Sequence, residues 1–425
     1  MLKKHPKGIM NLFFTEMWER FGFYIMMAVF VLYMDKQFGW EDSVKGDFYG
    51  LFLGAVYFIP ILGGWFGDKL FGRVDTIRAG SLAMIAGYVS LALSSLDTIY
   101  FFYTGLFLVA FGTGIFKVNI AVLIGDLYHE KPQLKDAGFN IYYMGVNIGA
   151  TIAPVTATIL GSIYGNYNIS FWAAALGMTL SLIIFETGKN HFRNLEAIIK
   201  AKTPEKSVKE NAANGAEETQ RIITLLILFV IVIFFWIGFY QNGFALTLFA
   251  ERSTIESDIL RPETYQFFNP FFILILTPVL LSFFNILARR GTEPSTPRKI
   301  LLGMLIMGLS MVIMVIASLN GGNLDQNIMS PMWLISTYFV VTLAEILISP
   351  MGLSFVSKVA PARVQGVMMG CWFGATALGS YGSGLLGKYY SDFAHHEYFI
   401  VLTGLLIFSA ILVILFIKKL KRFSA

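Results

Sequence analysis

Twelve apolar stretches, each about as long as a membrane-spanning helix, run through this chain of 425 residues. A transmembrane helix needs roughly 20 consecutive residues that are mostly apolar. With 56% hydrophobic and only 14% charged residues, the chain is too apolar for a soluble protein. The sequence therefore predicts an all-α membrane protein with twelve transmembrane helices, near 10–34, 46–66, 77–96, 98–125, 137–161, 171–187, 221–250, 265–288, 299–318, 331–357, 364–387 and 397–417.

A hydrophilic segment from about Gly188 to Gln220 separates the twelve stretches into two sets of six. Its composition is polar and flexible, as in a linker. We therefore expect an N-terminal six-helix bundle over 1–187, a cytoplasmic linker over 188–220 and a C-terminal six-helix bundle over 221–425. The linker is too short for an extra helix pair, and carriers built from two similar halves have this layout.

The distribution of basic residues predicts the orientation, because lysine and arginine are in excess in cytoplasmic loops. An even number of spans places both termini on one side, where 25 of the 32 lysine and arginine residues fall. The opposite side has five, and the other two, Arg20 and Lys117, lie within spans. We expect a multi-pass plasma-membrane protein with both termini in the cytoplasm. These loops account for the net charge of +5, which therefore indicates no nucleic-acid partner.

Five charged side chains lie inside the predicted spans: Glu16, Glu19, Arg20, Lys117 and Glu345. Each costs roughly 2.5–3.5 kcal/mol at the bilayer centre, so such residues usually face a protein interior or a wet cavity and pair there. Two cations against three carboxylates leave one carboxylate without a partner, and a buried carboxylate of that kind tends to take up a proton. This pattern suggests a proton-coupled carrier of a small zwitterion.

The first span places Glu16, Glu19 and Arg20 on one helical face, because their spacing is i, i+3 and i+4. Two interpretations stay open: a structural ion cluster that ties this helix to its neighbours, or a site for a proton and a substrate. Lys117 and Glu345 occupy spans four and ten, which are equivalent if the halves repeat. They are a candidate gate ion pair that joins the two halves.

Several motifs resemble the proton-dependent oligopeptide transporter family of the major facilitator superfamily. The first is the E-x-x-E-R-F pattern that begins at Glu16, and the strongest is the span-five segment from Lys135 to Gly149. The loop after span two is similar to the signature loop of the superfamily. Its matching residues are Gly64, Asp68, Lys69, Gly72 and Arg73, and further matches are Lys117 with Asn119, Trp236, Asn269, the segment from Glu345 to Gly352, and Trp372.

The resemblance implies a twelve-helix major facilitator fold and a symporter that imports di- and tripeptides with protons. Its proton-coupling residues would be Glu16, Glu19, Arg20 and Glu345. The carboxylate of the peptide would meet Arg20, Lys117 and Asn147, and its amino end would meet Glu345 and Asn269. Tyr24, Tyr57, Trp236 and Trp372 would line side-chain pockets, and Ser349 belongs to the span-ten part of the site. The family implies a bacterial inner-membrane protein that is not an enzyme, and we expect a monomer with no cofactor or metal ion.

Two departures from the family pattern bear on the proton pathway. Many members carry a second arginine where this chain has Met27, and a glutamate where it has Tyr240. In the family, that pair is thought to bridge helices one and seven. Both charges are missing together, so neither position is left with an unpaired charge. The proton must then use Glu16 or Glu19, or Glu345 while substrate is absent.

Other functions stay open. The same fold could carry nitrate, a small amine or a drug, and Met27 and Tyr240 keep this alternative in view. A sensor that binds peptide without moving it is a second alternative. An enzyme is disfavoured because no Ser–His or paired-His pattern occurs at membrane depth, and no Walker loop indicates ATP as the energy source.

Overall fold

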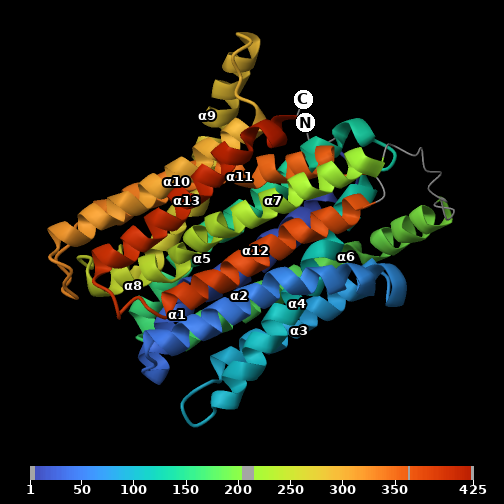
Figure 1. Cartoon of the computed structure of the whole chain (residues 1–425). Helices are drawn as coiled ribbons and strands as arrows, with labels where there is room; N and C mark the ends of the chain where they lie inside the picture. Colours follow the sequence, from blue (N-terminus) through green and yellow to red (C-terminus); the bar gives the residue numbers. More distant parts are fainter. Residues whose placement is uncertain (1–4, 203–214, 362–363, 423–425) are drawn as a thin grey trace. The chain divides into compact units, whose positions relative to one another are not determined.

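The computed structural model describes residues 5–202, 215–361 and 364–422, and its described part consists of helices and short connections (Figure 1). The α-helices are α1 (Ile9–Phe38), α2 (Asp42–Trp65), α3 (Arg73–Ala92), α4 (Ile99–Leu127), α5 (Lys135–Tyr164), α6 (Asn168–Lys202), α7 (Gly215–Phe239), α8 (Ala245–Arg252), α9 (Phe268–Arg289), α10 (Thr296–Asn320), α11 (Met332–Val359), α12 (Gln365–Gly387) and α13 (His395–Arg422). The predicted all-α class is confirmed.

Each of the twelve predicted stretches falls on helix. The seventh is made of α7, a 3-10 turn over Tyr240–Gly243 and the short helix α8. Within the described residues, ten helical segments are long and apolar enough to cross a membrane, and α3 and α12 are not among them. The first turns of α3 carry charges, and α12 is rich in glycine and serine, which lowers the hydropathy of both helices. The count of twelve spans therefore stays a prediction.

The chain divides into two compact units, which are described here one at a time. Unit 1 consists of Met1–Gly39 and Ala55–Ser207, and unit 2 consists of Trp40–Gly54 and Val208–Ala425. The division cuts through α2, so that the first turns of this helix belong to unit 2 and the remainder belongs to unit 1.

In unit 1, α1 packs against α5 and α6, and α3 packs against α4 and α6. Two glycines of α5, one turn apart, let its backbone approach that of α1. A Cβ atom on Gly145 would lie 2.9 Å from the carbonyl oxygen of Phe13, and one on Gly149 would lie 3.0 Å from the amide nitrogen of Phe21. Small residues allow such close approach of membrane helices. The position of α5 relative to α1 is therefore set by backbone contact.

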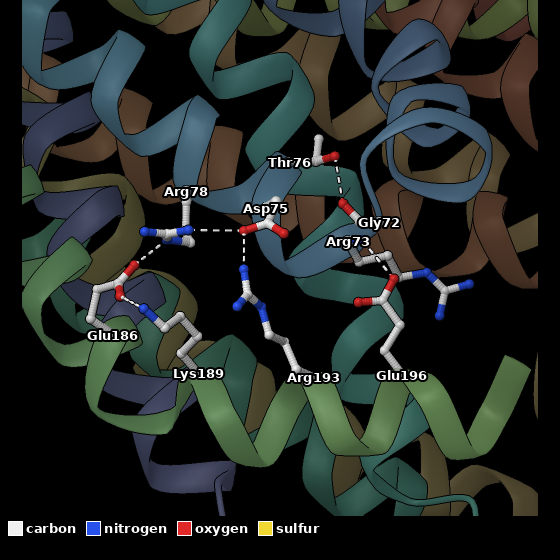
Figure 2. Close-up of polar contacts among 9 residues, drawn as sticks. All are labelled: Gly72, Arg73, Asp75, Thr76, Arg78, Glu186, Lys189, Arg193 and Glu196. Atoms are coloured by element: carbon white, nitrogen blue, oxygen red, sulfur yellow. Dashed lines mark hydrogen bonds and ion pairs between the residues drawn. The ribbon is translucent and has the colours of Figure 1, made fainter.

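The helix α6 continues well beyond the predicted end of its span at residue 187, and ion pairs attach this extension to α3 (Figure 2). Glu186 pairs with Arg78 and with Lys189, the latter at 2.6 Å. Asp75 pairs with Arg78 at 2.9 Å and with Arg193 at 2.6 Å. Single exposed pairs contribute only about 0–1 kcal/mol each, so the attachment depends on the whole network.

The signature loop is held from both sides. On the α6 side, Glu196 Oε1 accepts a hydrogen bond of 2.8 Å from the backbone N–H of Arg73, at the first residue of α3 (Figure 2). The Arg73 side chain pairs with Asp126 of α4 and, at 3.1 Å, with Asp68. Asn119 of α4 donates a hydrogen bond of 2.8 Å to the carbonyl oxygen of Gly63, which anchors the end of α2.

In unit 2, α10 packs against α11 and α13, α7 packs against α12 and α13, and α9 packs against α11. The first turns of α2 lie on α12. A Cβ atom on Gly46 would lie 2.6 Å from the carbonyl oxygen of Gly384, and one on Gly50 would lie 2.7 Å from that of Tyr381. Arg252, the last residue of α8, holds the start of α2 through Asp42, with contacts of 2.7 and 3.0 Å to its two carboxylate oxygens.

Candidate functional site

The charged residues of α1 form one buried cluster in unit 1. Arg20 Nη2 donates a hydrogen bond of 2.6 Å to Glu19 Oε1, and its Nε donates to Glu19 Oε2. The same Nε atom lies 3.2 Å from Glu16 Oε1. All three residues are at most 4% exposed. The shared helical face that the spacing indicated therefore brings the two carboxylates to one guanidinium.

The two carboxylates of this cluster differ in how they are held. Both oxygens of Glu19 accept hydrogen bonds from Arg20. Glu16 Oε2 is buried, and within the described part of the chain it has no hydrogen-bond partner. A proton can therefore bind at Glu16 Oε2 without displacing the guanidinium from Glu19. The arrangement suits a fixed ion pair at Glu19 and a protonation site at Glu16.

Tyr142, on α5, lies close enough to Glu16 to interact with its charge. Tyr142 lies in the span-five motif, but the sequence predicts no separate role for it. Only the close approach of α5 to α1 brings this residue near Glu16.

Lys117 of α4 carries a positive charge that no carboxylate of the described part of unit 1 neutralises by an ion pair. Its Nζ atom lies 5.0 Å from the centroid of the Tyr57 ring, a cation–π contact. Tyr24 lies close enough to Arg20 to interact with its charge. Asn147 is buried, and its side-chain amide donates a hydrogen bond of 2.8 Å to the carbonyl oxygen of Tyr143. Tyr57 thus adjoins Lys117 and Tyr24 adjoins Arg20, whereas the hydrogen bond of Asn147 is within its own helix.

The charged site residue predicted in unit 2 is a carboxylate, opposite in charge to Lys117. Glu345 Oε2, on α11, accepts a hydrogen bond of 2.8 Å from Asn269 Nδ2 of α9, which also contacts Thr342 Oγ1 at 3.1 Å. Among the described residues of this unit, no cation forms an ion pair with Glu345. Ser349 follows Glu345 by one helical turn, so it lies on the same face of α11.

The other predicted site residues of unit 2 are aromatic side chains on α7 and α12. Trp236 stacks on Tyr240 with ring centroids 5.7 Å apart. The buried indole N–H of Trp236 has no hydrogen-bond partner in the part that the structure describes. Trp372 lies against Gly352 of α11, where a Cβ atom would come within 2.5 Å of its ring. Tyr240, in place of the glutamate that many family members have there, is thus part of an aromatic layer, and Met27 is buried within unit 1.

The predicted gate ion pair would join residues of different units. Lys117 belongs to unit 1 and Glu345 to unit 2, so their gate ion pair stays a prediction. In the signature loop, Gly72 has a φ of 79°, a value that favours glycine, and Gly64 lies on the last turn of α2. The side chain of Lys69 is outside the described residues. No group of three or more His, Cys, Asp or Glu residues in the described part could hold a metal ion.

Comparison with known proteins identifies the family. The model of the POT family matches residues 74–214 and 195–401 of this chain. The "Uncharacterized transporter YclF" of Bacillus subtilis (strain 168) is 30% identical, over 90% of this chain and 89% of its own length. "Dipeptide and tripeptide permease A" of Escherichia coli (strain K12) is 28% identical, over 90% of this chain and 85% of its own length.

Solved structures agree with the sequence comparison. The crystal structure of a mutant of the peptide transporter POT, in complex with alafosfalin, matches with a TM-score of 0.87 and 29% identity, over 99% of this chain and 96% of that one. A POT family transporter in complex with 5-aminolevulinic acid matches with a TM-score of 0.84 and 25% identity, over 98% and 97%. The chain therefore belongs to the POT family, the transporter family that its motifs resemble, and it has the major facilitator fold.

Proposed function

We propose that this protein imports di- and tripeptides together with protons by alternating access. The proposal is supported by several relatives that are named as di- and tripeptide permeases or transporters. The observation that carries it is that the predicted site residues of the two units bear opposite charges. Within the described residues of each unit, unit 1 supplies the cation Lys117 without an ion-paired carboxylate, and unit 2 supplies the carboxylate Glu345 without an ion-paired cation. In the proposal, the carboxylate of a dipolar ligand pairs with Lys117 and its amino group pairs with Glu345.

Di- and tripeptides of different sequence share only their backbone and charged ends, so a carrier of many peptides should bind those ends. In the proposal, Lys117, Arg20 and Asn147 receive the carboxylate of the peptide, and Glu345 with Asn269 receives its amino group. Tyr24, Tyr57, Trp236 and Trp372 then contact the side chains, since aromatic surfaces tolerate varied apolar groups. The indole N–H of Trp236, which has no hydrogen-bond partner among the described residues, can donate to a peptide carbonyl.

We infer that Glu16 carries the proton. Glu19 is held by Arg20 through both of its oxygens, whereas Glu16 keeps a buried oxygen that has no hydrogen-bond partner among the described residues. Protonation of Glu16 would leave the Arg20–Glu19 pair intact and remove one negative charge from the cluster. Glu345 is the second candidate when no peptide occupies the site, because burial without an ion-paired cation disfavours its charge.

The driving force follows from orientation and charge. With both termini in the cytoplasm, as the basic loops predict, protons enter from the opposite side. A membrane potential that is negative inside adds about 2.3 kcal/mol per positive charge per 100 mV. The ligand can shift the carrier between its two states only through different affinities for them. Peptide and proton must therefore each bind with different affinities to the outward-open and inward-open states.

Uptake of labelled dialanine into proteoliposomes tests the function. An imposed gradient, acidic outside, should drive accumulation above equilibrium, and unlabelled tripeptides should compete. Lys117→Ala should abolish this accumulation, because the peptide carboxylate loses its uncompensated cation. Uptake near the wild-type level in this variant would remove Lys117 from the site, and peptide binding without uptake in the wild type would indicate a sensor.

A second candidate substrate class is a small non-peptide zwitterion. A solved relative binds 5-aminolevulinic acid, which has an amino group and a carboxylate like a peptide. Competition in the same assay by 5-aminolevulinic acid, nitrate, a small amine and a drug separates these cargoes. Stronger competition by any of them than by dipeptides would replace the peptide assignment.

A further inference from the structure

A buried histidine begins α13 in unit 2, away from the residues of the proposed transport site. His395 is 6% exposed. Its ring stacks on Tyr390, with ring centroids 5.3 Å apart and an angle of 14° between the planes, and it makes a T-shaped contact of 5.9 Å with Phe249 of α8. Tyr390 and Phe249 are themselves buried. The imidazole ring is therefore packed among aromatic side chains, although histidine is a titratable residue.

This histidine binds the connection between α10 and α11, residues 321–331, to the start of α13. Asp325 Oδ1, on the connection, lies 3.2 Å from His395 Nε2. Beside this contact, the backbone N–H of His396 donates a hydrogen bond of 2.9 Å to Asn323 Oδ1. Further along, the connection is held by backbone hydrogen bonds to residues that follow α8. Its attachment to α13 thus depends on two side chains of the connection, Asp325 and Asn323.

The charges around His395 favour a neutral ring. The titratable or charged groups next to it are Asp325 of the connection, Arg252 of α8, Tyr390 between α12 and α13, and, on α13 itself, His396, Glu397 and Tyr398. The Asp325 side chain is 58% exposed, and ion pairs with exposed partners contribute little. Arg252 would repel a second positive charge. Because a buried charge is costly unless it is well compensated, a protonated His395 fits this environment poorly.

We propose that His395 is an acid-sensitive latch, whose neutral ring holds the α10–α11 connection on α13 and whose protonation releases it. The neutral ring can donate its Nε2 hydrogen to Asp325 while it stays on Tyr390. A proton on the second nitrogen adds a charge among buried rings, and the ring regains full hydration only by leaving them. Histidine ordinarily titrates at about pH 6.5, so acidification of the surrounding solution can operate the latch.

The latch goes beyond the proposed function and does not depend on peptide transport. The basic loops predict that this end of α13 is external, so the latch would respond to the exterior. The connection leads directly into α11, the helix that carries Glu345. An acidic exterior would thus loosen the attachment at the start of α11 under the same conditions that are proposed to drive uptake.

The test is the distance between two spin labels on the purified protein. In a Cys371→Ser background, one label is attached at Gln326→Cys on the connection and the other at Ile400→Cys on α13, both of which are exposed positions. At about pH 8 the distance distribution should be narrow, because histidine is then neutral. At about pH 5 the narrow population should decrease several-fold. A distribution that is unchanged, or narrower at the lower pH, would overturn the proposal.

Two variants show whether His395 is the group that titrates. His395→Gln, which is neutral at every pH, should keep the narrow population at both pH values. The matched control is His396→Gln, which removes the neighbouring, partly exposed histidine but keeps the backbone N–H that Asn323 accepts. This control should respond to pH like the parent protein. A full response in His395→Gln, or none in His396→Gln, would contradict the assignment to His395.

Asp325→Asn distinguishes a latch that is closed by a neutral ring from one that is closed by an ion pair. An asparagine oxygen can still accept the hydrogen of Nε2, but it no longer offsets the charge of a protonated ring. The narrow population should therefore persist at about pH 8 and should be lost at a higher pH than in the parent protein. Loss of the narrow population already at about pH 8 would show that the charge of Asp325 holds the connection, and the proposal would be wrong.

Discussion

Glu16 and Glu19 lie three residues apart on one helix and yet have different surroundings. The sequence places both on the face of Arg20, because i, i+3 and i+4 positions coincide on a helix. It does not predict which carboxylate Arg20 binds through both oxygens. Lys117 of α4 and Tyr142 of α5 also lie near Glu16, and the sequence alone does not place them there, because their positions follow from helix packing. The members of this charged cluster were thus predictable, but their pairing was not.

Replacement of each glutamate by glutamine should separate their roles. Glu19→Gln leaves buried Arg20 without its two-oxygen partner, and loss of one member of a buried ion pair costs about 3–5 kcal/mol of stability. Glu16→Gln removes a carboxylate that makes a single, longer contact of 3.2 Å with Arg20, so the loss of stability should be smaller. Glu16→Gln should retain peptide counterflow but lose the response to a pH gradient.

Thermal unfolding of the purified variants and uptake in proteoliposomes measure the two effects. The expected order is a clearly lower melting temperature for Glu19→Gln and lost proton coupling for Glu16→Gln. A Glu16→Gln variant that still concentrates peptide on a pH gradient would place the proton elsewhere, with Glu345 as the next candidate.

At the scale of the element, helix positions were more predictable than helix contacts. Each apolar stretch became helix, because its length and composition demand it in a bilayer. The extension of α6 to Lys202 was not predicted, because its polar composition reads as a linker. In the structure this polar surface is helical and pairs with α3 through Arg193 and Glu196. A local composition cannot reveal a partner that lies more than 100 residues away.

The contact of α2 with α12 is another such case. Gly46, Gly50 and Gly54 repeat every four residues and so lie on one face of α2. This face packs on Gly384 and Tyr381 of α12, with backbone atoms as the nearest neighbours of Gly46 and Gly50. Small residues on one face permit a close helix contact, but the sequence does not say which helix takes part.

Gly50→Leu should therefore destabilise the protein. A Cβ atom at this position would lie 2.7 Å from the carbonyl oxygen of Tyr381 and 3.1 Å from the Cα atom of Gly384, and neither backbone atom can move aside. Overpacking of this kind costs typically about 1–3 kcal/mol. The measurement is the melting temperature in detergent, with Gly374→Leu on α12 as control, since no atom lies within 4 Å of a Cβ there. Equal melting temperatures in both variants would contradict the close contact.

At the scale of the whole molecule, α2 is the element that both units share. Its first turns, within Trp40–Gly54, belong to unit 2, and its later turns belong to unit 1. The sequence predicted six helices in each half and a boundary only at the linker. The structure describes one continuous helix whose two ends pack with different units. A carrier that works by alternating access, as proposed, must then change the contacts of one end of α2.

The start of α2 is held in unit 2 by a buried cluster around Asp42. This carboxylate binds Arg252 through both oxygens and pairs with Lys45 at 2.8 Å. Lys45 is 1% exposed, so Asp42 neutralises a fully buried cation. Ser391 donates a further hydrogen bond to the same carboxylate. The loss of this one negative charge would leave two positive charges close together.

Asp42→Asn should therefore release the first turns of α2 from unit 2. In a Cys371→Ser background with Leu53→Cys, a buried reporter on these turns, labelling by a thiol reagent should become several-fold faster, and the melting temperature should fall. The matched control is Asp47→Asn, one turn later. Its partly exposed pair with Lys388, at 2.9 Å, should contribute only about 0–1 kcal/mol, so labelling should change little. If Asp42→Asn and Asp47→Asn label at the same rate, the buried cluster does not hold α2, and the glycine contacts with α12 must suffice.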